Sequence, residues 1–170
     1  MEGKGERMKE NIREVTLEEL PECVQVIQNA FKTVADQYGF TIENAPRFTA
    51  FSINENRLKQ QLCVEKRPMY VFLLDGKIVG YYSLALLSEK EIELNNLSVL
   101  PEYRHNKIGT KLLQDCFERA RKLGTDKIKI GIVEENTVLR AWYEKNGFYH
   151  TCTQKFDFFP FICGYMEKKI

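Results

Sequence analysis

The sequence predicts an α/β domain in which a mixed sheet is covered by helices on both faces. Along the 170-residue chain, segments of alternating apolar residues are interspersed with segments whose apolar residues recur every three to four positions. An Asp75-Gly76 turn joins two strand-like segments into a hairpin. With no repeat and no linker to divide the chain, the predicted order is β-α-α-β-β-β-α-β-α-β-β.

The N-terminal part is predicted to hold a flexible segment, a short strand and a long helix. Residues 1–9 are polar and contain glycine, so we expect flexibility there and one domain over residues 10–170. A strand is expected over residues 12–15. The capping box Thr16-Leu17-Glu18-Glu19 then predicts a helix to about residue 38.

A loop and a second helix are predicted next. Residues 40–51 have no regular period and contain three phenylalanines, which favours a loop able to form one wall of a pocket. A second capping box, Ser52-Ile53-Asn54-Glu55, predicts a helix to about Lys66. The side chains expected to point inward from this helix are Leu58, Leu62 and Cys63.

The remaining elements follow from alternation and turn residues. Strands are predicted over residues 69–74, 78–87, 91–99, 127–133, 148–156 and 162–167. Helices are predicted over residues 108–123 and, capped by Asn136, up to Lys145. The inward side chains of the last helix should be Val138, Leu139, Trp142 and Tyr143.

One strand has an irregular apolar pattern. Ile92 and Leu94 share one parity, whereas Leu97 and Val99 share the other, so a regular strand would send the two pairs to opposite faces. One extra residue near Asn95-Asn96, a β-bulge, would put all four on the core side and free backbone N–H groups. The alternative is a sheet buried on both faces, which needs no bulge.

The stretch from Leu97 to Leu113 reads as a buried strand, a short basic turn and the first turns of a helix. Pro101 removes a backbone donor where the strand should stop, and the apolar period becomes helical from Ile108. Amide N–H groups and the positive dipole end of a helix favour a phosphate-bearing ligand at such a turn. The alternative is a connection without a ligand.

This stretch resembles the GNAT superfamily of N-acetyltransferases. Val99, Pro101, Arg104 and Gly109 match its Val-x-Pro-x-x-Arg motif and the end of its Arg/Gln-x-x-Gly-x-Gly/Ala loop, whereas Lys107 stands where the first glycine is usual. The resemblance implies a largely antiparallel sheet and a loop that holds the pyrophosphate of acetyl-coenzyme A on backbone amides. Lys107 can keep that role if its backbone angles are ordinary. The implied cofactor-binding residues are Leu97, Ser98, Val99, Arg104, His105, Asn106, Lys107, Ile108, Gly109, Thr110, Asn136 and Tyr143.

A second constellation also resembles the family. Asn136 and the segment Ala141–Phe148 match the family's Asn…Ala-x-x-Tyr-Glu-Lys-x-Gly-Phe pattern. In the family, the asparagine contacts the cofactor arm and the tyrosine lies near the coenzyme A sulfur. The resemblance implies Tyr143 as the acid for the departing thiolate, because a phenol can protonate one. It also implies Glu93, six residues before Val99, as a catalytic base for the amine. The alternatives are a packed aromatic ring and a glutamate paired with a lysine.

The resemblance therefore implies an enzyme that transfers the acetyl group of acetyl-coenzyme A to a primary amine of a small-molecule or peptide acceptor, by direct attack in a ternary complex. A non-catalytic coenzyme A-binding module and a transferase of another acyl group remain alternatives. The phenylalanines of residues 40–51 and 156–161 predict an apolar wall of the acceptor pocket or a homodimer contact.

Composition argues against several other classes. Lys and Arg total 25 against 24 acidic residues, which disfavours a nucleic-acid or membrane-surface binder. No apolar run approaches a membrane span, and the N-terminus has no apolar core typical of a signal peptide. Five cysteines without Cys-x-x-Cys spacing favour free thiols in a reducing cytoplasm. His150 and Cys152 would share a strand face, but two ligands alone predict no metal site.

Overall fold

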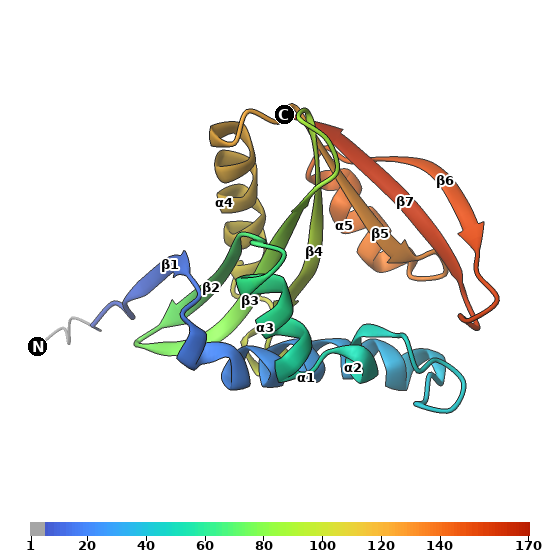
Figure 1. Cartoon of the computed structure of the whole chain (residues 1–170), viewed down its shortest axis with the longest axis horizontal. Coiled ribbons are helices and arrows are strands. Elements are labelled where there is room, and N and C mark those ends of the chain that lie inside the picture. Colours follow the sequence, from blue (N-terminus) through green and yellow to red (C-terminus); the bar gives the residue numbers. More distant parts are fainter. Residues whose placement is uncertain (1–5) are drawn as a thin grey trace, which may run out of the picture.

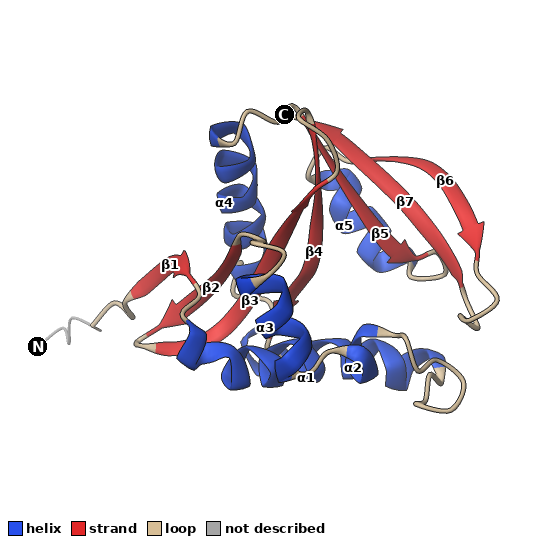
Figure 2. Cartoon of the chain, viewed as in Figure 1, coloured by secondary structure: helices blue, strands red, loops and turns tan. Residues whose placement is uncertain are grey.

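A computed structural model describes residues 6–170, which form a seven-stranded sheet with helices on both faces (Figures 1 and 2). The strands are β1 (Glu10–Glu14), β2 (Met69–Leu74), β3 (Lys77–Leu86), β4 (Glu91–Val99), β5 (Lys127–Val133), β6 (Tyr149–Lys155) and β7 (Ile162–Lys169). The helices are α1 (Leu20–Tyr38), α2 (Thr49–Ser52), α3 (Glu55–Cys63), α4 (Ile108–Lys122) and α5 (Thr137–Lys145), with short 3-10 turns at Leu17–Glu19 and Pro101–Tyr103.

The sheet order is β1-β2-β3-β4-β5-β7-β6. Every neighbouring pair is antiparallel except β4 and β5, which run parallel. This arrangement confirms the predicted mixed, largely antiparallel sheet.

Two adjacent tyrosines of β3 show which helix covers which face. The Tyr82 hydroxyl donates to Asp115 of α4 at 2.6 Å, whereas burial and Cys23 of α1 raise the pKa of Tyr81. Successive strand residues point to opposite faces, so α4 and α1 lie on opposite sides of the sheet. The ring of Phe148, just after α5, packs at 6.0 Å from Phe117 of α4, so α5 shares the α4 face.

Between β4 and β5 the sheet opens. These strands are in register only over Glu91–Glu93 and Lys127–Lys129, at the start of each. Beyond that point they diverge toward α1 and α2, which gives the V-shaped outline in Figure 1. The gap lies beside the irregular part of β4.

The predicted β-bulge in β4 is confirmed. Asn95 pairs with Ser83 and Ser98 with Tyr81, so Asn96 and Leu97 together face one residue of β3, and Asn96 has a φ of +53°. Leu94 pairs with Leu84 and Val99 with Gly80. Because residues 80 and 84 have the same parity, Leu94 and Val99 point to the same face despite being five positions apart.

The N-terminal predictions need two adjustments. Thr16 N–H donates to the Glu19 carboxylate at 2.9 Å as expected, but a 3-10 turn precedes α1. β1 covers Glu10–Glu14 rather than residues 12–15, because Glu10 pairs with Leu74. Residues 1–5 of the predicted flexible segment lie outside the described residues, while Lys9 N–H donates to Asp75 at 2.7 Å.

The second predicted capping box is wrong. Asn54, not Ser52, caps α3, and its Oδ1 accepts from Arg57 N–H at 2.8 Å. Ser52 instead ends α2, a short helix whose first three residues lie in the region predicted as loop. Leu58 is buried and Leu62 packs against the main core as predicted, but Cys63 is exposed and Gln61 is buried in its place.

Two further side-chain predictions are also wrong. Val138, predicted inward, is 80% exposed on the first turn of α5. His150 pairs with Met166 and Cys152 with Tyr165, so a bulge at Thr151 puts His150 and Cys152 on opposite faces. Counting alternate residues along the sequence assumes a regular strand, so it could not reveal the extra residue.

The core has two parts. The main cluster fills the space between the sheet and helices α1, α3 and α4, and includes Cys23 and Cys116 as the small buried residues expected from their patterns. A second cluster joins the end of α1 to the aromatic segments, with Phe40, Phe48 and Phe161 buried. Within residues 6–170, no helix is both long and apolar enough to cross a membrane.

Candidate active site

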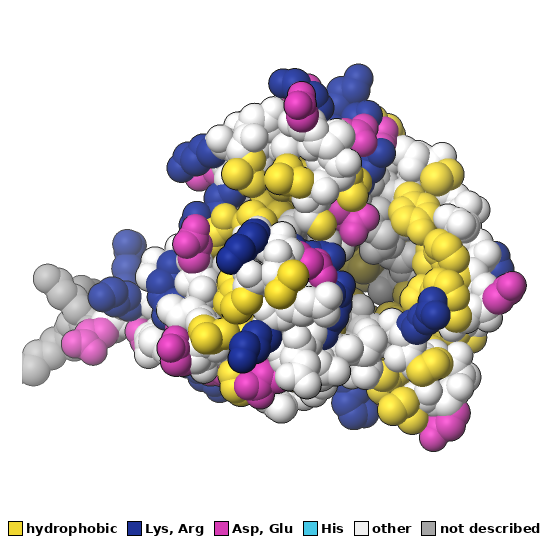
Figure 3. All heavy atoms as spheres, viewed as in Figure 1, with side chains coloured by type: hydrophobic (Ala, Val, Ile, Leu, Met, Phe, Trp, Pro, Cys, Tyr) yellow, Lys and Arg dark blue, Asp and Glu magenta, His cyan; other side chains and the backbone are white. Residues whose placement is uncertain are grey.

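Two cavities meet in the opening between β4 and β5. The sheet cavity, of about 500 Å³, lies between the diverging strands, and the turn cavity, of about 580 Å³, lies against the turn from Tyr103 to Lys107. Figure 3 shows a hollow on the right of the molecule, with hydrophobic side chains along its right-hand rim. Both cavities are lined by Phe31, Val34, Leu97, Asn136, Leu139 and Trp142, so they form one continuous groove.

The turn cavity ends at the N-terminus of α4. Ile108, Gly109 and Thr110 line it, and their N–H groups belong to the first helical turn, where no intrahelical acceptor exists. Unpaired donors and the helix dipole together favour an anion there. The geometry therefore fits the phosphate-binding turn expected from the sequence.

Lys107 does not meet the condition of ordinary backbone angles set for it from the sequence. Its φ is +61°, in the left-handed region, and His105 has a φ of +67°. Glycine adopts this conformation at the lowest cost, which explains why a glycine is usual at the position of Lys107. Lys107 keeps the shape of the turn and adds backbone strain to it.

Arg104 serves as a tether between the turn and α1. Its guanidinium donates to Thr33 Oγ1 and to the Ala30 carbonyl oxygen, both at 3.0 Å. Partial burial lowers the pKa of Arg104 from its ordinary value. These two hydrogen bonds fix the turn against α1. Arg104 also lines the turn cavity.

The α5 helix places Asn136 and Tyr143 in the groove. The Asn136 Oδ1 accepts from Leu139 N–H at 3.2 Å, which caps the helix and fixes the residue where both cavities meet. Tyr143 is 6% exposed and lines the sheet cavity. Burial raises the pKa of its phenol, so the hydroxyl keeps its proton.

Glu93 reaches the sheet cavity from the other face of the sheet. It pairs with Ala85 of β3, which has the parity of Tyr81 and therefore faces α1, whereas Tyr143 comes from the α4 and α5 side. Burial raises the pKa of the Glu93 carboxyl. The opening thus brings the two predicted catalytic residues to one cavity from opposite faces.

Not every predicted residue contributes a side chain to the groove. Leu97 lines both cavities and Val99 lines the turn cavity. Ser98 is 2% exposed and its hydroxyl donates to the Asn96 carbonyl oxygen at 2.8 Å, while the Asn106 amide donates to the Tyr103 carbonyl oxygen at 3.2 Å. Neither Ser98 nor Asn106 lines a cavity, so their side chains have structural contacts instead.

Comparison with known proteins identifies the family. The model of the Acetyltransferase (GNAT) family matches residues 32–148. The chain belongs to this family. The GNAT resemblance of the two motifs is therefore confirmed, and the protein is an acetyltransferase by family.

Relatives and solved structures agree with this assignment. The spermidine N(1)-acetyltransferase of Thermoplasma acidophilum is 27% identical over 167 residues, which cover 95% of this chain and 98% of that protein. The PaiA N-acetyltransferase of Thermoplasma acidophilum, solved in complex with coenzyme A, has a TM-score of 0.82 at 23% identity, covering 96% of this chain and 100% of that one. The ribosomal-protein-S18-alanine N-acetyltransferase of Escherichia coli has a TM-score of 0.73 at 17% identity, covering 95% and 94% of the two chains.

The GNAT groove also contains residues that sequence reasoning missed. Cys163 and Tyr165 of β7 and Arg47 before α2 line the sheet cavity, although none of them lies in a motif. Burial raises the pKa of Cys163, so its sulfur is held as a thiol, which is a poor nucleophile. No sequence signal marks Cys163 and Tyr165, because long-range pairing of β7 with β5 brings them to the cavity.

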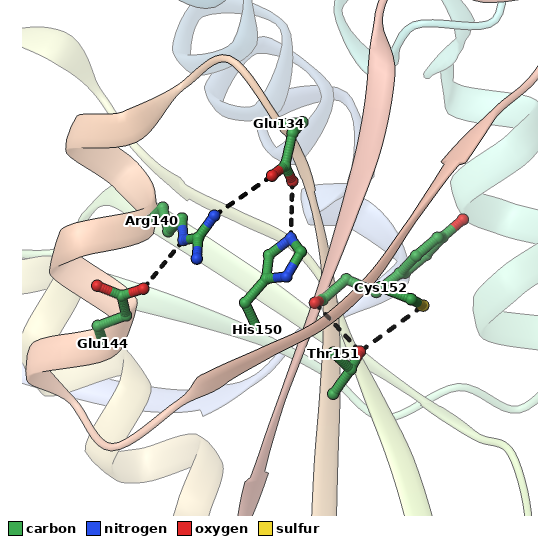
Figure 4. Close-up of polar contacts among 7 residues, drawn as sticks. Glu134, Arg140, Glu144, His150, Thr151 and Cys152 are labelled. Atoms are coloured by element: carbon green, nitrogen blue, oxygen red, sulfur yellow. Dashed lines mark hydrogen bonds and ion pairs between the residues drawn. The ribbon is translucent and has the colours of Figure 1, made fainter.

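A polar network holds the N-terminal end of α5 against β6. The Glu134 carboxylate accepts from Arg140 at 3.3 Å and lies 2.9 Å from His150 Nε2, and Arg140 also donates to Glu144 at 2.9 Å (Figure 4). Figure 4 also shows Cys152 pointing away from His150. Among residues 6–170 there is no group of three or more His, Cys, Asp or Glu side chains placed to hold a metal ion.

Proposed function

We propose that this GNAT enzyme transfers the acetyl group of acetyl-coenzyme A to a primary amine by direct attack in a ternary complex. The observation that carries the proposal is the continuous groove through the sheet. One end holds the first turn of α4, and the other holds Glu93 and Tyr143. The coenzyme A in the solved PaiA relative supports the same ligand here.

The turn would bind the pyrophosphate of the co-substrate. Backbone N–H groups of Ile108, Gly109 and Thr110 would donate to phosphate oxygens, helped by the helix dipole. The ammonium of Lys107, which lines the same cavity, would add a charged contact. Leu97 and Val99 would contact the apolar part of the coenzyme A arm.

The β4 bulge would supply the donor that the carbonyl needs. Asn96 and Leu97 lie opposite one β3 residue and line the sheet cavity, so the bulge releases backbone groups from the regular ladder. An N–H group aimed at the acetyl oxygen stabilises the negative charge that develops there during attack. Binding both substrates in one groove also aligns them for reaction.

The two titratable groups then account for the protons. The amine nitrogen bonds to the acetyl carbon as the carbon–sulfur bond breaks, and the amine loses a proton toward Glu93. The departing thiolate takes a proton from Tyr143, whose raised pKa keeps the phenol protonated until it is needed. Because burial also raises the pKa of Glu93, its carboxylate is a stronger base than an exposed glutamate.

A charge placed at the turn tests the proposal. A Cβ atom at Gly109 would lie 3.5 Å from the Trp142 ring, an ordinary contact, so Gly109→Ala should fold and retain coenzyme A binding. Gly109→Asp adds a carboxylate beside the expected phosphates and should abolish binding in calorimetry. Equal affinity of the folded Asp and Ala variants would contradict the site.

Turnover provides the second half of the test. Thiol release from acetyl-coenzyme A should require a primary amine and should be lost in Gly109→Asp. Faster release from a longer acyl-coenzyme A than from acetyl-coenzyme A would assign a different acyl group. Release that no primary amine accelerates would contradict amine acetylation.

A further inference from the structure

The sheet cavity has an aromatic wall on its acceptor side. The aromatic wall consists of Phe31, Phe48, Phe159, Phe161 and Tyr165, which come from four separate parts of the chain. Its phenylalanine rings pack against one another: the Phe159 and Phe161 centroids are 4.6 Å apart and stacked, and Phe48 meets Phe161 at 5.8 Å. The wall therefore presents a continuous apolar surface to the amine acceptor.

A second layer keeps this wall in place. Phe40 is buried behind it, with ring centroids 5.1 Å from Phe48 and 4.8 Å from Phe161. Phe31 meets Phe48 edge to face at 5.9 Å. Because these rings support each other, the acceptor meets a preformed surface.

Few charged side chains line the sheet cavity. Among the described residues that line it, Glu93 is the one carboxylate and Arg47 is the one cation. The Arg47 guanidinium lies 4.2 Å above the ring of Phe158 at the rim. Lys155 adds another cation nearby, since its ammonium donates to the carbonyl oxygens of Phe156 and Phe159.

We infer that the acceptor is a primary amine carried on a single apolar body, aromatic or aliphatic, and that polyamines are poor acceptors. The inference rests on the proposed function, because it assigns the reacting ammonium to Glu93. One ammonium can be neutralised there, and an apolar body gains by leaving water against the aromatic wall.

A second ammonium has no comparable partner. It would lie against the aromatic wall or beside Arg47, without a carboxylate, and would lose hydration. Ring faces can attract a cation, but one face of Phe159 and one face of Phe161 are turned to each other, so fewer faces are left for it. The name of the spermidine N(1)-acetyltransferase relative implies a polyamine acceptor for that protein. The charge pattern of this cavity leads us to expect a different acceptor here.

Two amines of equal chain length test the inference. n-Hexylamine ends in a methyl group where hexamethylenediamine carries a second ammonium. The ratio of their kcat/KM values in the thiol-release assay therefore measures the effect of the distal charge. We expect n-hexylamine to be favoured by about 100-fold, and spermidine to be as poor as the diamine. Equal or better use of the diamine or of spermidine would overturn the inference and leave amine acetylation standing.

Charge reversal at the rim links the preference to the structure. Arg47→Glu replaces the cation by a carboxylate and should shift the kcat/KM ratio toward the diamine by about tenfold. Lys59→Glu makes the same change in charge on the exposed side of α3 and should leave the ratio unchanged. Equal ratios in the two variants would overturn the charge argument. If neither n-hexylamine nor the diamine promotes thiol release by the wild-type protein, the inference fails, whereas the proposed function fails only if no primary amine at all promotes it.

Discussion

At the scale of single residues, burial affects the two catalytic candidates differently. For Tyr143 the raised pKa keeps the hydroxyl protonated, but it also makes the phenol a weaker acid toward the departing thiolate. For Glu93 the raised pKa makes the carboxylate more basic, but it also moves protonation closer to neutral pH. Each residue therefore has a separate kinetic signature.

Removing the Tyr143 hydroxyl should slow the chemical step. Tyr143→Phe keeps the ring contacts with Trp142 at 4.9 Å and Phe148 at 5.2 Å, so the fold and the affinity for coenzyme A should persist. We expect kcat to fall by about 100-fold, the lower end for a positioned proton donor. Steady-state kinetics with calorimetry measures both quantities. An unchanged kcat would remove Tyr143 from the proton path.

Replacing Glu93 by glutamine should change the pH profile. The base works only when deprotonated, so its raised pKa places the acidic limb of kcat/KM above that of an exposed glutamate. Glu93→Gln should remove this limb, and higher pH, at which more of the amine is neutral, should partly restore turnover. A wild-type profile from Glu93→Gln would show that the limb belongs to the amine itself.

Thermal melting supplies the control for that variant. A carboxyl whose folded pKa is raised stabilises the fold fully below its unfolded pKa and loses that contribution as the pH rises through the folded pKa. Near pH 8 the buried charge of Glu93 is therefore unfavourable. Glu93→Gln should melt at the same temperature as the wild type or higher, so lost activity would not reflect unfolding.

Lys107 combines a strained backbone with a charge at the turn. Lys107→Gly relieves the left-handed strain, so stability should hold or rise by about 1 kcal/mol. Its coenzyme A affinity should fall by about fivefold at low salt, and by less at high salt, because an ammonium contact is lost. Lys107→Met keeps the strain but removes the charge, and should show the same loss of affinity. Equal dissociation constants for Lys107→Met and the wild type at both salt concentrations would exclude a phosphate contact.

At the scale of elements, close approach of α4 to the sheet depends on a strand glycine. A Cβ atom on Gly80 would lie 2.8 Å from the Leu112 side chain, 3.1 Å from Phe72 Cβ and 3.3 Å from the Ser98 carbonyl oxygen. Leu112 belongs to the helix whose first turn forms the candidate phosphate site. Packing at Gly80 therefore affects how far that turn stands from β4.

Gly80→Ala should destabilise the protein by about 1–3 kcal/mol, because Phe72 Cβ and the Ser98 carbonyl are backbone-fixed and cannot move away cheaply. Gly131→Ala is the matched control in β5, where a Cβ atom would lie 3.6 Å from the Tyr165 ring. Urea unfolding of both variants measures the difference. Equal midpoints would show that α4 shifts to accept the extra methyl group.

Elements were predictable where the signal is local. The parity change between Leu94 and Leu97 revealed the β4 bulge, and the spacing of Asn136 and Gly147 marked the start and end of α5. The start of α3 was not predictable in this way, because Ser52 and Asn54 both have capping chemistry and Ser52 is the last residue of α2. The bulge at Thr151 left no mark, since the residues around it are all polar or exposed.

At the scale of the whole molecule, sequence predicted the motif half of the groove better than the acceptor half. The turn at Lys107 and the Tyr143 helix are contiguous motifs, so a resemblance could locate them. The aromatic wall and Arg47 come from segments distant in sequence, and only their phenylalanine content gave a signal. That content predicted an apolar wall but could not assign its charge pattern.

The opening of the sheet leads to a prediction for the whole chain. β4 and β5 are in register over three residues each, so the two sheet halves share little direct pairing and a ligand in the groove would bridge them. Coenzyme A should therefore slow amide hydrogen exchange in three places: the bulge at 96–99, the turn at 104–110 and the first turn of α5.

Distant elements should serve as internal references in the same measurement. β2 at Met69–Leu74 is paired on both sides and lines neither cavity, so its exchange should change little when coenzyme A binds. Gly109→Asp should show no protection in any of the three segments, whereas Gly109→Ala should match the wild type. Protection spread evenly over β2 and the groove would indicate general stabilisation by the ligand. Protection confined to the turn would mean that the ligand does not reach the sheet opening, and the placement of Tyr143 and Glu93 at the reacting end would fail.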